Sequence, residues 1–410
     1  MTSCSFVLGT VNANALTYSA EETSLQWAIG QAIDCSLLLK EADARLQMKL
    51  AECWQAGVLP NPAINFEFNE IRLTGQRSPF RELQASFEIS QLIELGNKRS
   101  ARQNVLAAEA SAILWETESI KQNLIKTVTG VYADAFTAQM KLNLLKELHQ
   151  NATNIVECLT EKVKNGKTSP ILQRKSILAR HAISVDLKKA EATLASVKRQ
   201  LTLLCGGSFD CLQQISDPIL PITPPRPIEY YLGSICKNTE IAQLEAAQLV
   251  SRYNYDLQRA NSIPNAIFST GLEHDSPFGG CRLCFELGFE IPVFNRNQGN
   301  ISRAAWEEYS IVYKIQDLER QLTARCQDLY ADWIRNYETI ELIQMELIPA
   351  AQELLQIHSN REASGKEDCL ERLEANKDLF DLHLQYIDAV NGFYHLKADM
   401  RFLCGTDFDN

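Results

Sequence analysis

Long apolar runs, basic clusters and chain breakers are all scarce in this sequence. No stretch approaches the roughly eighteen consecutive apolar residues of a transmembrane helix, so we expect any membrane span to consist of β-strands. Forty basic and fifty-one acidic residues give a net charge of −11. This argues against a nucleic-acid binder, because neutralising phosphates requires basic clusters. Only 18 glycines and 13 prolines, with 45% hydrophobic residues, indicate a folded chain.

Catalytic and cofactor-binding motifs are also missing from the sequence. The six histidines are scattered, and there is no H-x-x-x-H pair, glycine-rich phosphate loop or G-x-S-x-G. Cys281 and Cys284 have C-x-x-C spacing, but on a regular strand their side chains would point to opposite faces. Cys205 and Cys211 are close enough to pair in an oxidising compartment. We therefore expect a conduit, with no catalytic residue, no metal site and no cofactor, and not an enzyme.

Alternating apolar and polar residues predict two β-hairpins, one at 62–96 and one at 264–294. Successive side chains of a strand point to opposite faces, so each hairpin has an apolar and a polar face. The apolar set contains Phe66, Phe68, Phe87, Phe285, Leu287 and Phe289, and the polar set contains Asn65, Glu67, Glu88, Glu286 and Glu290.

The two hairpins belong to an internal duplication. At an offset of 198, Phe87-Glu88-Ile89 matches Phe285-Glu286-Leu287, Asn97-Lys98 matches Asn295-Arg296, and Ser78-Pro79-Phe80 matches Ser276-Pro277-Phe278. At an offset of 199, Gly166 matches Gly365, and Leu204-Cys205-Gly206 matches Leu403-Cys404-Gly405. We expect a first structural repeat at 21–213, a proline-rich linker at 214–230 and a second repeat at 231–410. Each repeat would contain a helix, a hairpin and a long helical hairpin, whose tips lie at 164–170 and 361–368.

The helices predicted within these repeats are long. They run over Glu21–Ala56, Asn97 to about Val163, Ile171–Cys205, Asn238–Asn261, Asn300–Arg361, and from the second tip to Cys404. Apolar residues from Ile311 to Ile340 recur in steps that sum to eleven, a period that keeps neighbouring helices almost straight. At the N-terminus, residues 1–20 fit either a weak or truncated signal peptide or an ordinary tail. Ala13-Asn14-Ala15 is like a cleavage site, but the basic region is missing.

Three runs of residues carry a family resemblance. They are Leu59-Pro60-Asn61-Pro62, the run from Ile291-Pro292-Val293-Phe294-Asn295-Arg296 to Asn297-Gln298-Gly299-Asn300-Ile301, and Ser364-Gly365 followed by Glu371, Glu374 and Ala375. With them the chain resembles the outer-membrane factor (TolC-like) family, and within it the heavy-metal efflux CzcC/CusC-like branch. The resemblance extends from about Ser24 to Gly405.

The resemblance implies a mainly α fold with a β-barrel part. Each protomer would contribute four strands and long antiparallel helices to a homotrimer. The trimer would close a 12-stranded transmembrane β-barrel in the bacterial outer membrane and an α-helical tunnel across the periplasm. The implied function is the channel of a tripartite efflux system for heavy-metal cations, with a periplasmic adaptor (membrane fusion protein) and an inner-membrane pump of the resistance-nodulation-division (RND) type as partners.

The resemblance also implies roles for residues at the tips and on the strands. Glu371, Glu374 and Asp368 would lie at the pore entrance, where carboxylates favour cations; a solvated acidic helix start is the alternative. Gly166, Lys167, Arg174, Lys175 and Gly365 would dock the adaptor or latch the tips. The first tip departs from the family pattern because it is basic and carries Leu172 and Lys175 at the corresponding positions. The polar strand set would line the lumen, and the apolar set would face outer-membrane lipid.

Two alternative functions remain at this point. The same architecture serves drug efflux or type I protein secretion, and the sequence shows no metal-ligand cluster that would favour metals. A soluble coiled-coil scaffold that bridges partners is the alternative from a different class. Fractionation distinguishes this scaffold from a channel, because the scaffold would be freely soluble after lysis.

Overall fold

The computed structural model describes residues 24–69, 84–166, 168–207, 222–275, 279–363 and 369–405. The chain divides into two compact units, and several helices continue from one into the other. One unit, which we call the sheet unit, comprises Leu37–Lys126, Pro225–Ile334 and Leu396–Asn410. The other, the helical unit, comprises Met1–Ser36, Thr127–Pro224 and Arg335–His395. The Ser78-Pro79-Phe80 and Ser276-Pro277-Phe278 motifs and Cys211 lie outside the described residues.

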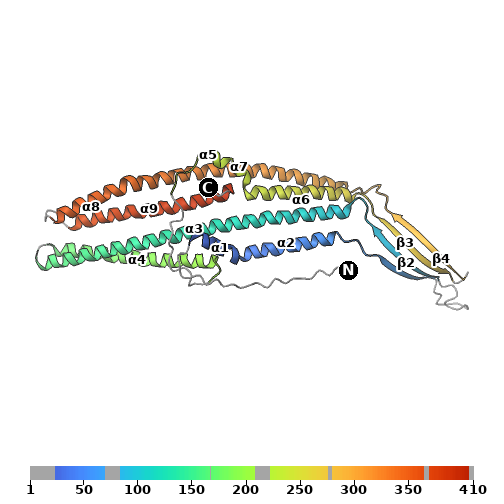
Figure 1. Cartoon of the computed structure of the whole chain (residues 1–410), viewed down its shortest axis with the longest axis horizontal. Coiled ribbons are helices and arrows are strands. Elements are labelled where there is room, and N and C mark those ends of the chain that lie inside the picture. The colour runs from blue at the N-terminus through green and yellow to red at the C-terminus, as the bar shows by residue number, and fades with distance from the viewer. Residues whose placement is uncertain are drawn as a thin grey trace. The chain divides into compact units, whose positions relative to one another are not determined.

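The sheet unit contains the β-strands of the described chain. They are β1 (Ala63–Asn69), β2 (Gln84–Ile93), β3 (Ala266–Asp275) and β4 (Gly280–Phe289). All neighbours are antiparallel in the order β1-β2-β3-β4, so β2 and β3 join the two hairpins into one sheet (Figure 1). β1 and β4 are the two edge strands of this sheet.

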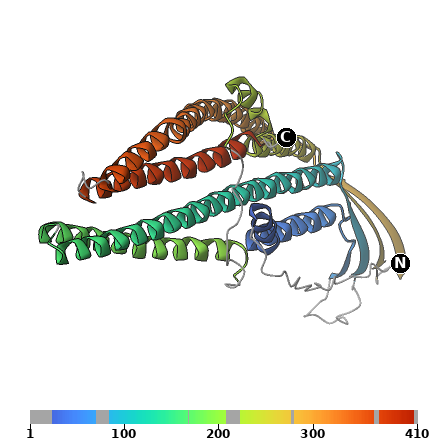
Figure 2. The same ribbon diagram turned by 60° about the vertical axis from the view of Figure 1, so that its left-hand side comes forward.

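Helices of both repeats complete the sheet unit. α2 (Leu37–Ala56) runs beside the first part of α3 (Lys98–Lys164), as their ribbons show in Figure 2. Two ion pairs link these helices, Arg45 with Glu116 at 2.9 Å and Lys49 with Glu109 at 3.0 Å. The second repeat supplies α5 (Ile228–Leu232), the 3-10 turn η2 (Ile235–Lys237), α6 (Thr239–Asn261), most of α7 (Gln298–Leu342) and the end of α9 (Cys369–Cys404).

Two antiparallel helical hairpins dominate the helical unit. The second half of α3 pairs with α4 (Pro170–Leu204), and α8 (Ile348–Ala363) pairs with α9 (Figure 1). α1 (Leu25–Cys35) and the π-helical turn η3 (Ile343–Leu347) complete the unit. Leu145 and Leu148 of α3 share a buried cluster with Phe380 of α9, which packs the two repeats together. Burying such side chains contributes about 1.5–3 kcal/mol each.

Polar contacts also join α3 to α9 within the helical unit. The Asp134 carboxylate accepts hydrogen bonds from Asn391 Nδ2 and from His395 Nε2, both at 2.9 Å. Lys141 of α3 pairs with Asp388 of α9. Burial alone would raise the pKa of Asp134, but the hydrogen bonds from His395 and Asn391 outweigh it and hold the pKa below its ordinary value. The carboxylate is therefore the stable form of this contact.

Three details differ from the sequence expectations. The predicted first helix is two helices, because Ser36 adopts an extended conformation between α1 and α2. The predicted long helix from Asn300 is interrupted by η3, which ends two residues before Pro349; this proline has no N–H to donate to the preceding turn. The proposed match of Asn97 with Asn295 is wrong by two residues. Asn97 and Asn297 both have positive φ, 56° and 58°, immediately before α3 and α7.

The expected fold class is confirmed, since the described chain is mainly helical with a small antiparallel four-stranded sheet. The apolar residues with eleven-residue periodicity also lie where the pattern predicts. Leu322, Cys326, Trp333 and Ile340 are buried, and the other members of the stripe are half-buried. The fold thus arranges both repeats around shared helical and strand contacts.

Candidate functional site

The sheet has one apolar and one polar face. Residues that pair across antiparallel strands lie on the same face, and the pairing places all six residues of the predicted apolar set together. Phe66 and Phe87 are direct partners whose ring centroids are 5.0 Å apart. Most of this face is open: Phe285 is 69% exposed and Phe289 64%. Side chains of this size rarely stay uncovered on a monomer, so the face needs an apolar environment.

The opposite face carries carboxylates. Glu67, Glu88 and Glu286 lie on it by register, together with Glu273 of β3, and they line a shallow hollow. Glu273 was not among the predicted site residues, although the alternation of β3 places it on the polar side. It pairs across the strands with Arg282 at 3.3 Å. The arrangement can attract cations along one face while the other face excludes water.

The pairing of β3 with β4 also settles the C-x-x-C question. Cys281 pairs with His274 in line with the apolar set, whereas Cys284 pairs with Gly271 on the polar face. The Cys281 thiol lies 3.6 Å from His274 Nδ1, and the Cys284 thiol lies 3.8 Å from Glu273 Oε2. The two thiols therefore lie on opposite faces of the sheet, as the spacing predicted.

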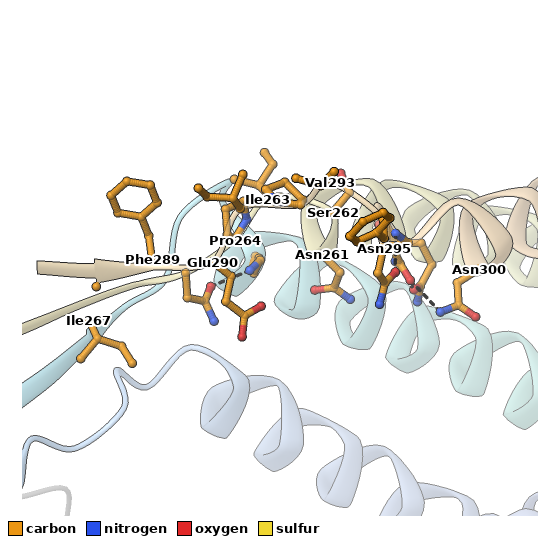
Figure 3. A pocket seen from close by; sticks show the side chains of 18 of the residues that line it. Asn261, Ser262, Ile263, Pro264, Ile267, Phe289, Glu290, Val293, Asn295 and Asn300 are labelled. Carbon is orange, nitrogen blue, oxygen red and sulfur yellow. Dashed lines mark hydrogen bonds between the residues drawn. The ribbon is translucent and has the colours of Figure 1, made fainter.

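A pocket lies where the strands meet the helices (Figure 3). Its lining includes Glu290, which follows β4, and Lys98, the first residue of α3. Lys98 is only 7% exposed, and its Nζ donates a hydrogen bond to Asn265 Oδ1 at 2.5 Å. The sequence analysis missed Lys98 and Asn265, because neither lies on a periodic face.

The Pro292–Asn300 run that carries the family resemblance builds one wall of this pocket. Asn297 Nδ2 donates to the backbone oxygen of Gln258 at 2.8 Å and to its Oε1 at 3.0 Å, and thus ties the start of α7 to the end of α6. Asn300 donates to Asn297 Oδ1 at 2.6 Å. These side chains form the corner between the last strand and the long helix, so in this structure the motif has a structural role.

The first helical tip is well described apart from Lys167. α3 ends at Lys164, Gly166 has a φ of 66°, and the Ser169 side chain caps α4. Arg174 and Lys175 are exposed on the first turns of α4. Leu172, by contrast, is buried against Ile155 and Leu159, which holds the two helices of the tip together. Arg174 and Lys175 are therefore open to solvent, while Leu172 packs between the two helices of the tip.

The second tip is described in part. Asp368 and Gly365 lie outside the described residues, as do Lys366 and Glu367. Glu371 and Glu374 both belong to α9, three residues apart and hence on adjacent positions of one helix face. Glu374 is exposed.

Within the described ranges, no three His, Cys, Asp or Glu side chains come close enough to hold a metal ion together. No helix among these residues combines the length and apolar character needed to cross a bilayer.

An amphipathic four-stranded sheet joined to two long helical hairpins is the architecture of outer-membrane efflux channels. A sequence model described as "Outer membrane efflux protein" matches residues 28–204 and 234–406. The chain therefore belongs to the outer membrane efflux protein family. This family consists of channels rather than enzymes.

Three relatives illustrate the family likeness. The cobalt-zinc-cadmium resistance protein CzcC of Cupriavidus metallidurans is 24% identical over 393 residues, which cover 94% of this chain and 89% of CzcC. The crystal structure of CusC matches with a TM-score of 0.77 at 17% identity, over 94% of this chain and 93% of CusC. The outer membrane protein VceC of Vibrio cholerae matches with a TM-score of 0.76 at 16% identity, over 94% and 97%. The two structural likenesses concern the fold.

Proposed function

We propose that the protein is the outer-membrane channel of a tripartite efflux system that exports heavy-metal cations. The observation that carries the channel proposal is the amphipathic sheet, whose apolar face exposes Phe66, Phe285 and Phe289 and whose polar face carries glutamates. Lipid on one side and a water-filled lumen on the other satisfy both faces at once. The lipid-facing set is then Phe66, Phe68, Phe87, Phe285, Leu287 and Phe289, and the lumen-lining set is Glu67, Glu88, Glu286 and Glu290.

The family resemblance implies a homotrimer, and the edges of the sheet support closure by several copies. In a bilayer the unpaired N–H and C=O groups of an edge strand cost several kcal/mol each. Four strands are too few to close a barrel, since single-chain examples begin at about eight. Pairing β4 of one copy with β1 of the next, three times over, would remove every edge and close a twelve-stranded barrel. The two repeats, 21–213 and 231–410, would then contribute equivalent hairpins on either side of the 214–230 linker.

The helices would extend from this barrel into the periplasm, with the two tips far from the membrane. Three copies each of Glu371, Glu374 and Asp368 would ring the pore entrance and favour cations. The basic first tip, with exposed Arg174 and Lys175, would dock the periplasmic adaptor or latch against the acidic tip. Gly166, Lys167 and Gly365 would shape these contacts, and an RND pump would deliver the substrate.

The choice of metal cations as substrate rests on the likeness to CzcC over most of both chains. The test is a deletion strain of the source bacterium, complemented with the wild-type gene or with an empty vector. We expect the deletion to accumulate Co²⁺, Zn²⁺ or Cd²⁺ and to become sensitive to them, and the wild-type gene to restore resistance. Unchanged metal tolerance with new drug sensitivity would instead favour drug efflux. Protein found entirely in the soluble fraction would refute the channel.

A further inference from the structure

Three sulfur atoms converge in the dry interior of the sheet unit. They belong to Cys326 of α7 and to Met400 and Cys404, which are one turn apart on α9. Met400 Sδ lies 4.0 Å from Cys326 Sγ and 3.8 Å from Cys404 Sγ. All three residues are 0% exposed.

This spacing matches three ligands around one soft metal ion. Sulfur atoms that bind a central ion at about 2.3 Å in a trigonal plane are about 4.0 Å from one another. The distances from Met400 Sδ to the two thiol sulfurs, 4.0 and 3.8 Å, already match this separation, so metal binding would need little rearrangement around Met400. Thiolate and thioether ligands select soft ions such as Cu(I). A fourth protein ligand of the kind that tetrahedral zinc prefers is missing, since no third His, Cys, Asp or Glu in the described chain joins this group.

The surroundings of the cluster suit an ion that must be kept from water. Tyr231 and Trp333 are 2% and 3% exposed, and their rings are 5.7 Å apart. The Cys404 thiol donates to the Tyr231 backbone oxygen at 3.6 Å, so this end of the site is already anchored. Burial, and then the neighbouring Cys326, raise the pKa of Cys404 to about 12. The metal-free thiols are therefore neutral, which a dry pocket tolerates.

The duplicated chain provides an internal comparison. Cys205 is the counterpart of Cys404 and, in the same way, donates its thiol to a backbone oxygen, that of Ala28, at 3.6 Å. The counterpart of Met400 is Leu201, which is buried but brings no sulfur. The packing role of this helix end therefore does not require a thioether. The sulfur at position 400 is therefore an addition of the second repeat, as is that of Cys326, whose counterpart at the same offset is Thr127.

We infer that Cys326, Met400 and Cys404 form a binding site for a soft monovalent metal ion of the Cu(I) type. When the ion enters, the S–H bonds of Cys326 and Cys404 break and their two protons leave to solvent. Two metal–thiolate bonds and one bond to the Met400 thioether form in their place, and no electron is transferred. The ion links α7 to α9 and so braces the sheet unit. This inference stands apart from the proposed efflux function, since a resident ion in the wall of the protein is not cargo in the lumen.

The test uses full-length protein purified with reductant and loaded with Cu(I) against a chromogenic Cu(I) chelator. We expect one tightly held equivalent per protomer, with X-ray absorption showing three sulfur ligands at about 2.3 Å. Affinity should rise with pH, because thiol protons are displaced. Met400→Leu preserves volume and should weaken this equivalent by more than about tenfold, since even outer partners of a metal cost that much.

Controls separate this site from the other cysteines. Cys205→Ala, the matched change in the first repeat, should bind as the wild type does, whereas Cys404→Ala should lose the equivalent. Equal uptake by wild type, Met400→Leu and Cys404→Ala would overturn the inference. A Cys326–Cys404 disulfide in protein isolated without reductant would overturn it as well. Tighter binding of Zn²⁺ than of Cu(I) at this site would contradict the assigned class of metal.

Discussion

The two faces of β4 can be tested with adjacent residues that receive the same new side chain. Phe285 lies near the middle of the strand on the apolar face and is 69% exposed, while Glu286 lies on the polar face. Arginine on a lipid-facing position near the bilayer midplane costs about 2–4 kcal/mol. Because about 1.4 kcal/mol corresponds to a tenfold change in an equilibrium constant, Phe285→Arg should lower the ratio of assembled to unassembled protein roughly 30- to 1,000-fold. Glu286→Arg should have a small effect, since the lumen is wet.

The assay measures heat-modifiable oligomer in the outer-membrane fraction for the wild type and both variants, at equal synthesis. We expect only Phe285→Arg to lose the oligomer, and Phe285→Leu serves as the apolar control. If both arginine variants assembled equally well, or if Glu286→Arg were the more damaging, the assigned faces of the sheet would be wrong.

Three further predictions concern the helices and tips. Asp134→Asn should destabilise the protein by about 1 kcal/mol at neutral pH, a value reduced for partial exposure. Because the pKa of Asp134 is lowered in the folded protein, its contribution to stability is lost as the pH falls below the ordinary value of 3.8. The melting temperatures of variant and wild type should therefore converge in acid and not above neutral pH. Gly96→Ala should cost about 1–3 kcal/mol more stability than Gly166→Ala. Both glycines have positive φ, but a Cβ at Gly96 would lie 2.7 Å from Ile263 Cδ1, whereas a Cβ at Gly166 would meet nothing within 4 Å. Equal denaturation midpoints would contradict this. The double variant Glu371→Gln with Glu374→Gln should lose the block by divalent cations in planar bilayers. The control double variant, Arg174→Gln with Lys175→Gln, should keep this block. Persistent block in the first variant would mean that the two glutamates are only a solvated helix start.

The sequence predicted those parts of the fold that rest on periodicity. Alternation placed Phe66 and Phe285 on one face and Glu67 and Glu286 on the other, and the pairing agrees. The eleven-residue stripe likewise located buried Cys326 and Trp333. Such patterns predict the structure correctly because the same few contacts repeat along each helix or strand.

Local backbone changes escaped prediction. The break at Ser36 has no glycine or proline to mark it. Pro349 does mark the five-residue π-turn Ile343–Leu347, but the apolar pattern continues across it, so periodicity alone predicts one helix. Lys98 and Asn265 are far apart in sequence, so their contact depends on how the two hairpins join. The convergence of Cys326 with Met400 and Cys404 needs the packing of α7 on α9, which no spacing within either helix specifies.

The most direct test of the central claim is the conductance of the purified wild-type protein, extracted from the outer-membrane fraction and added to a planar lipid bilayer. We expect discrete single-channel steps that prefer cations and are blocked by divalent cations on the order of millimolar concentration. A well-folded protein that inserts into the bilayer without conducting, or one that remains in the aqueous phase, would contradict the claim that it is a channel.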